Sequence, residues 1–357
     1  MNHRASHFAR CLVGLLIVFF PVMSFPTGAI AAPPDDMPQE DLFDHDDLLE
    51  LTLAGDLKTI FKDKSDDRPY RPATLWLQHS RDDSVSFDIG VKTRGYYRRL
   101  YLDCNVPPLR LNFKKKEVKN TIFAGQNKLK LVTHCKNSEV YEQYTLQEYL
   151  VYKSYNLLTD AGFRVRLVRI TYMDTQSKRK PVTHYGFLIE DEDRLAERLG
   201  GRLLETGVIQ QKKTNREQAA LLAVFQYMIG NTDWSVPGHH NIKIVFLGPD
   251  IPPLSIPYDF DMAGIISTRY AVPDARLGIR SVRERLFRGN CRTEEEFGAV
   301  FAQFDEQKEA IYSIYQDFPH LTQKNENRVV KYLDGFYKTI SRPKSIKREF
   351  LAECRES

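Results

Sequence analysis

Hydrophobic and polar positions alternate along the first half of the chain, and this pattern predicts β-strands. The segments with period-two alternation or dense β-branched and apolar content are 48–61, 74–80, 85–95, 109–115, 127–135, 165–174 and 183–191. Gly, Asn and Pro residues separate them, as is typical of loops between strands. Between the fifth and sixth segments, residues 141–163 place apolar side chains at helical spacing. Gly162 is expected to cap the C-terminus of that helix.

A helical period replaces this alternation after Glu190. The segments with helical spacing are 191–200, 215–230, 293–318 and 325–342. Thr293 followed by Glu296 is the capping-box pattern that starts a helix. Two short strand candidates, at 242–246 and 253–258, predict a hairpin inside this helical half. Strands followed by helices predict an α+β fold.

The chain is long enough for two lobes. We expect a strand-rich N-lobe with one main helix at 49–190 and a helical C-lobe at 191–357, a two-lobed, protein-kinase-like arrangement. A basic start, an apolar run and small residues predict a cleaved secretory signal peptide over 1–31. Two prolines interrupt the apolar run, so no stable membrane span is expected after cleavage. The acidic leader 32–48 is expected to be solvated, and the protein to be exported to the periplasm, the envelope or the medium.

Charge and cysteine content refine this picture. The formal net charge is +4, and removal of the signal peptide takes away two arginines and leaves +2. This balance gives no electrostatic case for binding nucleic acid. Four cysteines remain, at 104, 135, 291 and 354, and in an exported chain they predict disulfides. Cys104 and Cys135 flank a strand-rich segment and are the favoured pair, whereas Cys354 is the first candidate for a free thiol.

Two polar loops raise the question of function. The stretch NTDWSVPGHHN at 231–241 lies between a predicted helix and a predicted strand, and IPYDFD follows at 256–261. Asn-Thr-Asp and Asp-Phe-Asp are common in turns and caps, so turn chemistry is one interpretation. The other is a site for a metal and a nucleotide that is split over the two loops.

Phosphoryl transfer requires a carboxylate that orients the acceptor hydroxyl, and oxygen ligands that hold Mg²⁺ or Mn²⁺ against the phosphates. The order helix, loop, hairpin, loop assigns Asp233 as the acceptor-orienting base, and Asn241 and Asp259 as metal ligands. Asp261 is a further candidate ligand. Three other residues of the first loop are expected to make hydrogen bonds or to pack in the core: His239, His240 and Trp234.

Phosphate binding also requires a cation from the strand-rich half, commonly held by a helical Glu. Lys130 is the first candidate because apolar residues flank it, and Arg110 is the second. Glu148, on the main helix of that half, is the first candidate for its partner, with Glu142 and a purely surface role for Glu148 as alternatives. The run TRGYYRRLYLD at 93–103 could clamp phosphate or form a charged hairpin. The basic run at 277–289 is either a charged helix surface or a face for an acidic or phosphorylated ligand.

About half of the chain, residues 85–265, resembles the CotH-like (spore coat protein H) kinases. The resemblance is carried by LRLNFKKK, NKLKLVTHC, QEYLVYKSYNLLTDAGF, YGFLIEDED, NTDW…HHNIKIV and IPYDFD. It implies an atypical protein-kinase-like fold that uses ATP and Mg²⁺ to phosphorylate Ser or Thr of secreted or coat proteins. By this match Asp233, Asn241 and Asp259 take the roles given above, and Glu190 lies at the hinge between the lobes, near the adenine.

The chain departs from protein-kinase motifs in several places. It has no GxGxxG loop and no HRD motif, Asn241 lies eight positions after Asp233 instead of the five of HRDxxxxN, and DFD stands in place of DFG. The leading hypothesis is an exported phosphotransferase that uses Mg-ATP to phosphorylate a protein hydroxyl. A non-catalytic pseudokinase-like scaffold is the alternative, because ATP is scarce outside the cytoplasm. Metal-dependent hydrolysis by Asp259 and Asp261 is a third, without a His ligand cluster or Ser–His pair to support it.

Overall fold

Seven strands close into a barrel in the computed structural model, which describes residues 41–78, 83–176, 180–205 and 207–355. The strands are β1 Leu49–Gly55, β2 Arg71–Gln78, β3 Ser84–Thr93, β4 Leu109–Asn112, β5 Lys128–Val132, β6 Val165–Asp174 and β7 Val182–Ile189. Their order is β1-β2-β3-β4-β5-β7-β6, and β6 returns to β1 as a parallel neighbour. The predicted signal peptide and most of the predicted leader lie outside the described residues.

The alternation that predicted the strands also fills the barrel. Leu53, Leu75 and Val91 are each 0% exposed, as expected for the inward face of neighbouring strands. The predicted strand at 48–61 was too long, because helix α1 occupies Leu57–Lys62. The reason is Asp56, whose side chain accepts a hydrogen bond from the amide of Thr59 at 3.1 Å and so caps a helix.

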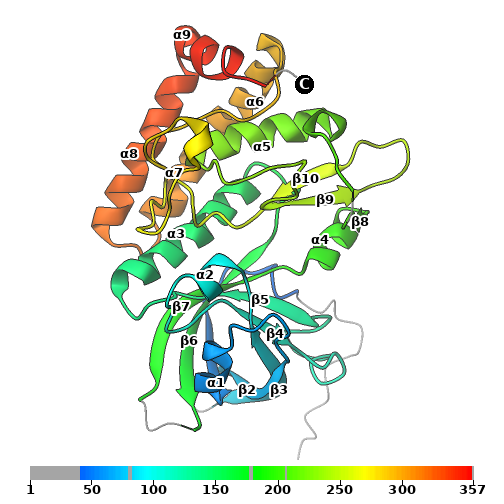
Figure 1. The fold of residues 1–357 in the computed structure, drawn as a ribbon, viewed down its shortest axis with the longest axis vertical. Helices are drawn as coiled ribbons and strands as arrows, with labels where there is room; N and C mark the ends of the chain where they lie inside the picture. The colour runs from blue at the N-terminus through cyan, green and yellow to red at the C-terminus, as the bar shows by residue number, and fades with distance from the viewer. Residues whose placement is uncertain (1–40, 79–82, 177–179, 206, 356–357) are drawn as a thin grey trace, which may run out of the picture. The chain divides into compact units, whose positions relative to one another are not determined.

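The main helix of this half, α3, covers Glu139–Asn156 and is shorter than predicted. Its C-cap is Leu157, so the expected cap at Gly162 was wrong. Gly162 instead lets the chain pass close to the helix, because an added Cβ would lie 2.8 Å from the ring of Tyr155. Helix α3 lies between the barrel and the helices of the second half (Figure 1).

The second half is mainly helical and carries a small sheet. Its elements are α4 Glu192–Arg198, β8 Arg202–Leu203, α5 Arg216–Ile229, β9 Ile242–Phe246, β10 Leu254–Pro257, α6 Glu294–Glu306, α7 Lys308–Gln316, α8 Gln323–Ile340 and α9 Pro343–Ile346. The predicted hairpin is present as β9–β10. The predicted capping box is also confirmed: Thr293 and Glu296 exchange hydrogen bonds at the start of α6.

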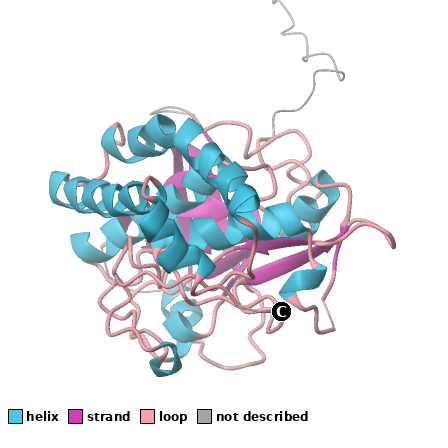
Figure 2. Cartoon of the chain, turned by 90° about the horizontal axis from the view of Figure 1, so that it is seen from above, coloured by secondary structure: helices cyan, strands magenta, loops and turns pink. Residues whose placement is uncertain are grey.

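Two helix predictions in this half were wrong. Residues 293–318 form two helices, because Gln307 ends α6 and begins α7. Residues 277–289 form turns after a short 3₁₀ helix at Ala275–Leu277, so they are no helix surface. Seen from above, the helices gather over the strands (Figure 2). The molecule is therefore a mixed α+β fold with a strand-rich N-terminal region and a helical C-terminal region.

The described part of the acidic leader is docked, in contrast to the expectation of a solvated segment. Leu42 is 0% exposed and packs in the core cluster of the barrel. Acidic side chains beside it pair with cations on several elements: Asp41 with Arg194, Asp44 with Arg164 at 2.9 Å, and Asp46 with Lys153 at 2.6 Å. The leader therefore links α3, α4 and the residue just before β6.

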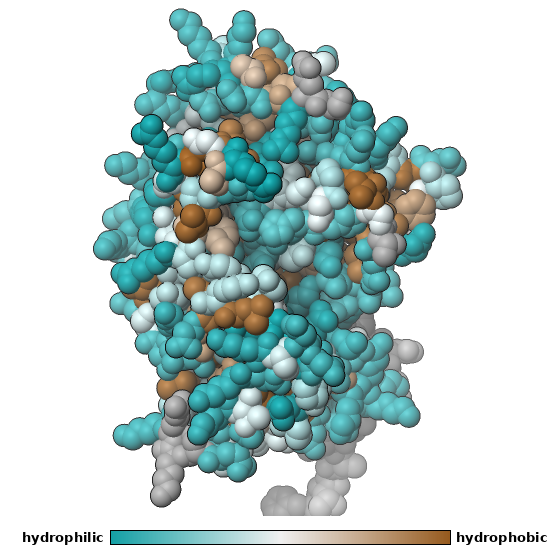
Figure 3. Space-filling view, in the orientation of Figure 1, coloured by the Kyte–Doolittle hydropathy of each residue, from teal (hydrophilic) through white to brown (hydrophobic). Residues whose placement is uncertain are grey.

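Two disulfides are present, Cys104–Cys135 and Cys291–Cys354. The first confirms the favoured pairing, and the second shows that Cys354 is not free. In the part of the chain that the structure describes, no helix is both long and apolar enough to cross a membrane. The face drawn in Figure 3 is mainly hydrophilic, with its hydrophobic side chains scattered in small groups.

Candidate functional site

The first site loop begins where α5 ends. Gly230 ends that helix in a left-handed conformation, with φ at 65°, which favours glycine. The amide of Asp233 then donates to Asn231 Oδ1 at 3.0 Å, and Ser235 pairs with His240 as an antiparallel β-bridge. The loop folds back on itself and presents Asp233 at its surface.

The carboxylate of Asp233 is held on both oxygens. His240 Nε2 lies 2.7 Å from Oδ1, and Asn241 Nδ2 donates to Oδ2 at 3.0 Å. The hydrogen bond to Asp233 raises the pKa of His240. His239 bonds a main-chain carbonyl, and Trp234 is 3% exposed, so the structural roles expected for these loop residues are confirmed. The Asp233 side chain remains 41% exposed and open to a ligand.

The β9–β10 hairpin brings the second loop to the first. Ile242 opens β9 opposite Pro257, which ends β10, so the residues just outside this pair are neighbours. The amide of Tyr258 donates to the carbonyl of Asn241 at 3.1 Å. Asn241 and Asp259 both have positive φ values, 52° and 60°. Non-glycine residues rarely adopt this conformation, and strain of this kind concentrates at functional sites.

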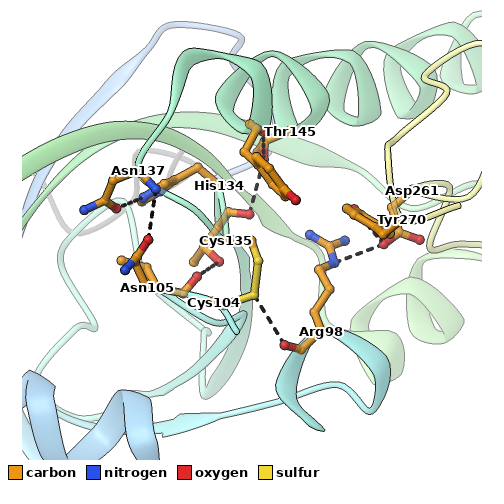
Figure 4. The surroundings of a disulfide bond; sticks show 12 residues. Arg98, Cys104, Asn105, His134, Cys135, Asn137, Thr145, Asp261 and Tyr270 are labelled. Atoms are coloured by element: carbon orange, nitrogen blue, oxygen red, sulfur yellow. Dashed lines mark hydrogen bonds and ion pairs between the residues drawn. A yellow bond between two sulfur atoms is a disulfide. The ribbon is translucent and has the colours of Figure 1, made fainter. Parts of the chain in front are cut away.

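Arg98, in the four-residue helix α2 Tyr97–Leu100, lies among three carboxylates. It donates to Glu148 of α3 at 3.0 Å, and its guanidinium lies 3.0 Å from Asp261 and 3.7 Å from Asp259. Figure 4 shows Arg98 pointing toward Asp261 and Tyr270, whose hydroxyl donates to Asp261 at 3.2 Å. The structure therefore gathers Asp259 and Asp261 with the predicted helical Glu148, around a cation that the sequence did not assign.

Glu148, Asp259 and Asp261 with Arg98 form an acidic corner of the site, which carries more negative than positive charge. Burial raises the pKa of Glu148 to about 8 and that of Asp261 to about 6, and repulsion among the three carboxylates adds to the effect although Arg98 opposes it. With Glu148 largely protonated at neutral pH, one guanidinium still faces the carboxylates of Asp259 and Asp261, so a further cation would be stabilised here. Asp259, at 44% side-chain exposure, is the carboxylate most open to one.

The oxygen atoms at this corner fit a hard divalent cation. Carboxylate and amide oxygens are the ligands that Mg²⁺ and Mn²⁺ prefer, and Mg²⁺ beside phosphates commonly uses only one or two carboxylates. Asn241 turns its amide nitrogen to Asp233, which leaves the amide oxygen for other contacts. Within the described ranges, no group of three or more His, Cys, Asp and Glu is arranged to hold a metal.

Lys130 makes a different pair from the one expected. Its Nζ lies 2.6 Å from Glu192 in α4, whereas Glu148 pairs with Arg98. The reason is register: Lys130 in β5 faces Ile189 in β7, three residues before Glu192. Burial lowers the pKa of Lys130 to about 8. Burial would raise the pKa of Glu192, but its ion pairs with Lys130 and with a second lysine lower it to about 2.

The other two predicted ligand contacts are in separate places. Arg110 faces Lys130 across β4 and β5 and lines the same cleft as Asp259. Glu190 is 4% exposed, and its carboxylate accepts two hydrogen bonds from Arg198, at 2.9 and 2.8 Å. It does not line the cleft. The predicted contact between Glu190 and adenine therefore stays a prediction. The Glu190 carboxylate is already engaged by Arg198.

A cleft of about 560 Å³ joins these groups. Seven of its lining residues are Lys or Arg and four are Asp or Glu: Arg68, Lys92, Arg94, Arg98, Arg110, Lys130, Lys243, Glu192, Asp233, Asp259 and Asp261. Arg94 is half-buried on this wall, and its Nε makes no hydrogen bond within the described residues. The cleft is thus cationic over most of its wall and acidic at one end, which suits a polyanion accompanied by a cation.

A second cavity of about 680 Å³ adjoins the first. Asp233, His240 and Met262 line both cavities. Asp233 therefore stands at the boundary between the cationic cleft and a separate space that can admit another group. This position suits a residue that acts on an acceptor brought next to an anionic donor.

The sequence left the role of the 93–103 run open and did not identify the partner of Lys130. Arg94 and Arg98 both belong to that run, for which a phosphate clamp and a charged hairpin were left open. Its dense aromatic and basic composition was the available signal. Nothing in the sequence near Glu192 distinguishes it from the other acidic residues of its helix.

Comparisons with known proteins give limited similarity. No protein-family model matches the chain, and no curated protein matches it. A crystal structure of the Golgi casein kinase has a TM-score of 0.32 at 10% identity, covering 70% of this chain and 74% of that chain. One of the Golgi casein kinase with Mn/ADP bound has a TM-score of 0.28 at 10% identity, covering 87% and 76%. Because both TM-scores are low, the chemistry proposed below rests on the contacts of this chain.

Proposed function

We propose that this chain is an exported, kinase-like phosphotransferase that uses ATP with Mg²⁺ or Mn²⁺ to phosphorylate a Ser or Thr hydroxyl of a protein. Its proposed family is that of the CotH-like kinases, with the strand-rich region as N-lobe and the helical region as C-lobe. The observation that carries the proposal is the position of Asp233. It lies between a cationic cleft and a second cavity, and its neighbour Asn241 is bonded to the loop of Asp259.

The cleft offers cations for a triphosphate. Arg94 Nε has no hydrogen-bond partner among the residues that the structure describes, and Arg110 and Lys130 lie side by side on β4 and β5. Cations in a partly enclosed cleft attract phosphates more strongly than exposed cations, because solvent screens them less. Arg98 takes the place that a strand lysine has in protein kinases, since it forms the ion pair with the helical glutamate Glu148.

Transfer itself needs little covalent chemistry from the protein. The acceptor hydroxyl oxygen bonds to the γ-phosphorus, and the bond from that phosphorus to the β–γ bridging oxygen breaks, so that ADP leaves with its electron pair. Asp233 orients the hydroxyl and accepts its proton. His240 and Asn241 hold the two carboxylate oxygens of Asp233. These contacts limit its rotation, which favours a productive geometry.

The metal ligands in this proposal are Asn241 and Asp259, with Asp261 as an additional ligand. When bound, Mg²⁺ or Mn²⁺ neutralises phosphate charge and supports the displacement electrostatically. Glu148 and Arg98 lie behind these ligands and hold Asp259 and Asp261 in place through the ion pairs described above. These residues fit a divalent metal ion in two respects: they offer oxygen ligands, and the acidic corner carries surplus negative charge.

One observation favours the alternative of a non-catalytic scaffold with the same fold. Arg98 already supplies a cation to Glu148, Asp259 and Asp261, so the acidic corner is partly neutralised without a metal. A protein that had lost metal binding would have this arrangement too. The two candidates differ in whether Mg-ATP binds.

Calorimetric titration with ATP, with and without Mg²⁺ or Mn²⁺, separates them. We expect binding that needs the metal and that is lost in Asp259→Asn, followed by transfer of the γ-phosphate to protein substrates. Asp250→Asn is the matched control, because Asp250 is exposed at the far turn of the same hairpin. It should bind as the unmodified chain does. If Mg-ATP does not bind, or binds equally well to Asp259→Asn, the assignment is wrong.

A further inference from the structure

The Cys104–Cys135 disulfide lies between the two elements that form the Arg98–Glu148 ion pair. Cys104 comes six residues after Arg98, in the loop that follows α2. Cys135 lies between β5 and α3, the helix that carries Glu148. Figure 4 shows the bond next to Arg98, and the Sγ of Cys104 is 3.3 Å from the main-chain oxygen of Arg98. The disulfide thus joins the loop after Arg98 to the loop that leads into the helix of Glu148.

Hydrogen bonds reinforce this junction on both sides of the disulfide. Val106 pairs with Cys135 as an antiparallel bridge, and its amide donates to the carbonyl of Cys135 at 3.1 Å. Thr133 Oγ1 donates to the carbonyl of Val106 at 2.7 Å. Thr145 of α3 in turn donates to the carbonyl of Thr133 at 3.2 Å. The contacts run from the α2 loop through the disulfide region to the body of α3.

Polar contacts of two buried arginines, Arg98 and Arg99, rather than apolar burial hold the segment that carries Arg98. Helix α2 has four residues, and a helix this short is not stable alone. Its tyrosines face solvent: Tyr96, Tyr97 and Tyr101 are 66%, 40% and 63% exposed. Arg99 bonds the main-chain oxygens of Lys64 and Ser65 and the carboxylate of Asp66, and all three residues are exposed. With so little apolar burial, this segment belongs to the class that opens locally at low cost.

We propose that the Cys104–Cys135 disulfide is a positioning element of the active site, which holds α2 so that Arg98 stays against Glu148 and Asp261. This inference rests on the proposed phosphotransferase function for its catalytic consequence. The disulfide touches no reacting atom and acts through Arg98. Its loss frees the α2 loop, lets Arg98 leave the acidic corner and lowers the rate of transfer.

The test compares two full-length variants, Cys104→Ser/Cys135→Ser and Cys291→Ser/Cys354→Ser. The second is a matched control, because it removes a disulfide that joins the segment before α6 to the end of the described chain and touches neither α2 nor α3. The two disulfides close loops of similar length, with sequence separations of 31 and 63 residues. Removing either one should therefore cost a similar amount of stability through the entropy of the unfolded chain. Each variant is measured for kcat, for KM of ATP with Mn²⁺, and for hydrogen exchange of residues 95–104.

We expect kcat to fall about tenfold to a hundredfold in the first variant, since small misplacements of catalytic groups cost factors of this size. KM for ATP should change less, and exchange of residues 95–104 should become faster. The control should keep kcat and the exchange of this segment while losing thermal stability. Equal kcat losses in both variants would show a general effect of stability and overturn the proposal.

Hydrogen exchange separates this proposal from the proposed function. If the unmodified chain transfers no phosphate, the phosphotransferase assignment fails, and the exchange result alone decides whether the disulfide positions α2. Faster exchange at 95–104 in the first variant but not in the control supports the positioning role. Unchanged exchange in that segment refutes it, whatever the activity.

Discussion

Replacing Arg98 with methionine tests the electrostatics of the acidic corner most directly. Methionine keeps much of the side-chain length and removes the charge, so it leaves Glu148 and Asp261 without the guanidinium that lies 3.0 Å from each. Their side chains are 2% and 11% exposed, so solvent replaces little of what they lose. The Asp259 side chain is 44% exposed, so water can solvate its carboxylate when Arg98 is removed. Asp259 therefore contributes less to the loss of stability.

The expected cost follows from this burial. Removing one partner of a buried ion pair commonly destabilises a protein by about 3–5 kcal/mol. We expect a value near the lower end at pH 7.5, because the pKa of Glu148 is already raised to about 8 and its carboxyl group can take up a proton. Below pH 6 the pKa of Asp261, about 6, lets that group protonate as well. A raised carboxyl pKa favours the folded state as the pH falls, so the loss should be smaller at pH 5.

Urea unfolding followed by tryptophan fluorescence measures the cost, since Trp234 is 3% exposed in the folded protein. Arg98→Met/Glu148→Gln supplies the second arm, because an amide replaces the carboxylate that Arg98→Met leaves unpaired. It should regain about 1–2 kcal/mol relative to Arg98→Met, a coupling typical of residues in contact. Arg99→Met is the control, since Arg99 is also buried but bonds mainly main-chain oxygens.

Two results would refute this reasoning. One is a loss below about 1 kcal/mol in Arg98→Met at pH 7.5, which would be typical of an exposed ion pair. The other is an equal effect of Glu148→Gln in the Arg98→Met and Arg99→Met backgrounds. Either would mean that Arg98 does not neutralise Glu148 in the folded protein.

Three further outcomes are expected. Asp233→Asn should lower kcat by about 10²–10⁴-fold with little change in the Kd of Mg-ATP, and an unchanged kcat would remove Asp233 from the base role. Asp233 raises the pKa of His240, so protonated His240 stabilises the folded protein below its ordinary pKa, and this contribution is lost as the pH rises. His240→Gln should therefore lower the Tm more at pH 5.5 than at pH 8.5. The difference should be small because His240 is exposed. Leu42→Ala should cost about 2–5 kcal/mol in urea unfolding because Leu42 is 0% exposed, whereas a solvated leader would lose almost nothing.

Local pattern was sufficient for most elements and for the two polar loops. Strand alternation predicted the barrel strands, and helical spacing predicted α5. The sequence could place Asn241 near Asp259 because the two residues flank a predicted hairpin, whose antiparallel strands bring its two ends together. Asp233 belongs to the same loop as Asn241. Each of these predictions depends on residues close together in sequence, where backbone geometry limits the outcomes.

Ion-pair partners and the leader depended on distant residues. Arg98 and Glu148 are 50 residues apart, and Lys130 and Glu192 are 62 apart. A charged side chain carries no mark of its partner, because attraction depends only on distance and burial in the folded chain. Hydrophobic and polar periodicity therefore sufficed for the strands, the helices and the loops between them. Barrel closure and the docking of α2 decided which cation meets which carboxylate, since only packing brings those charges within reach and excludes the water that would screen them.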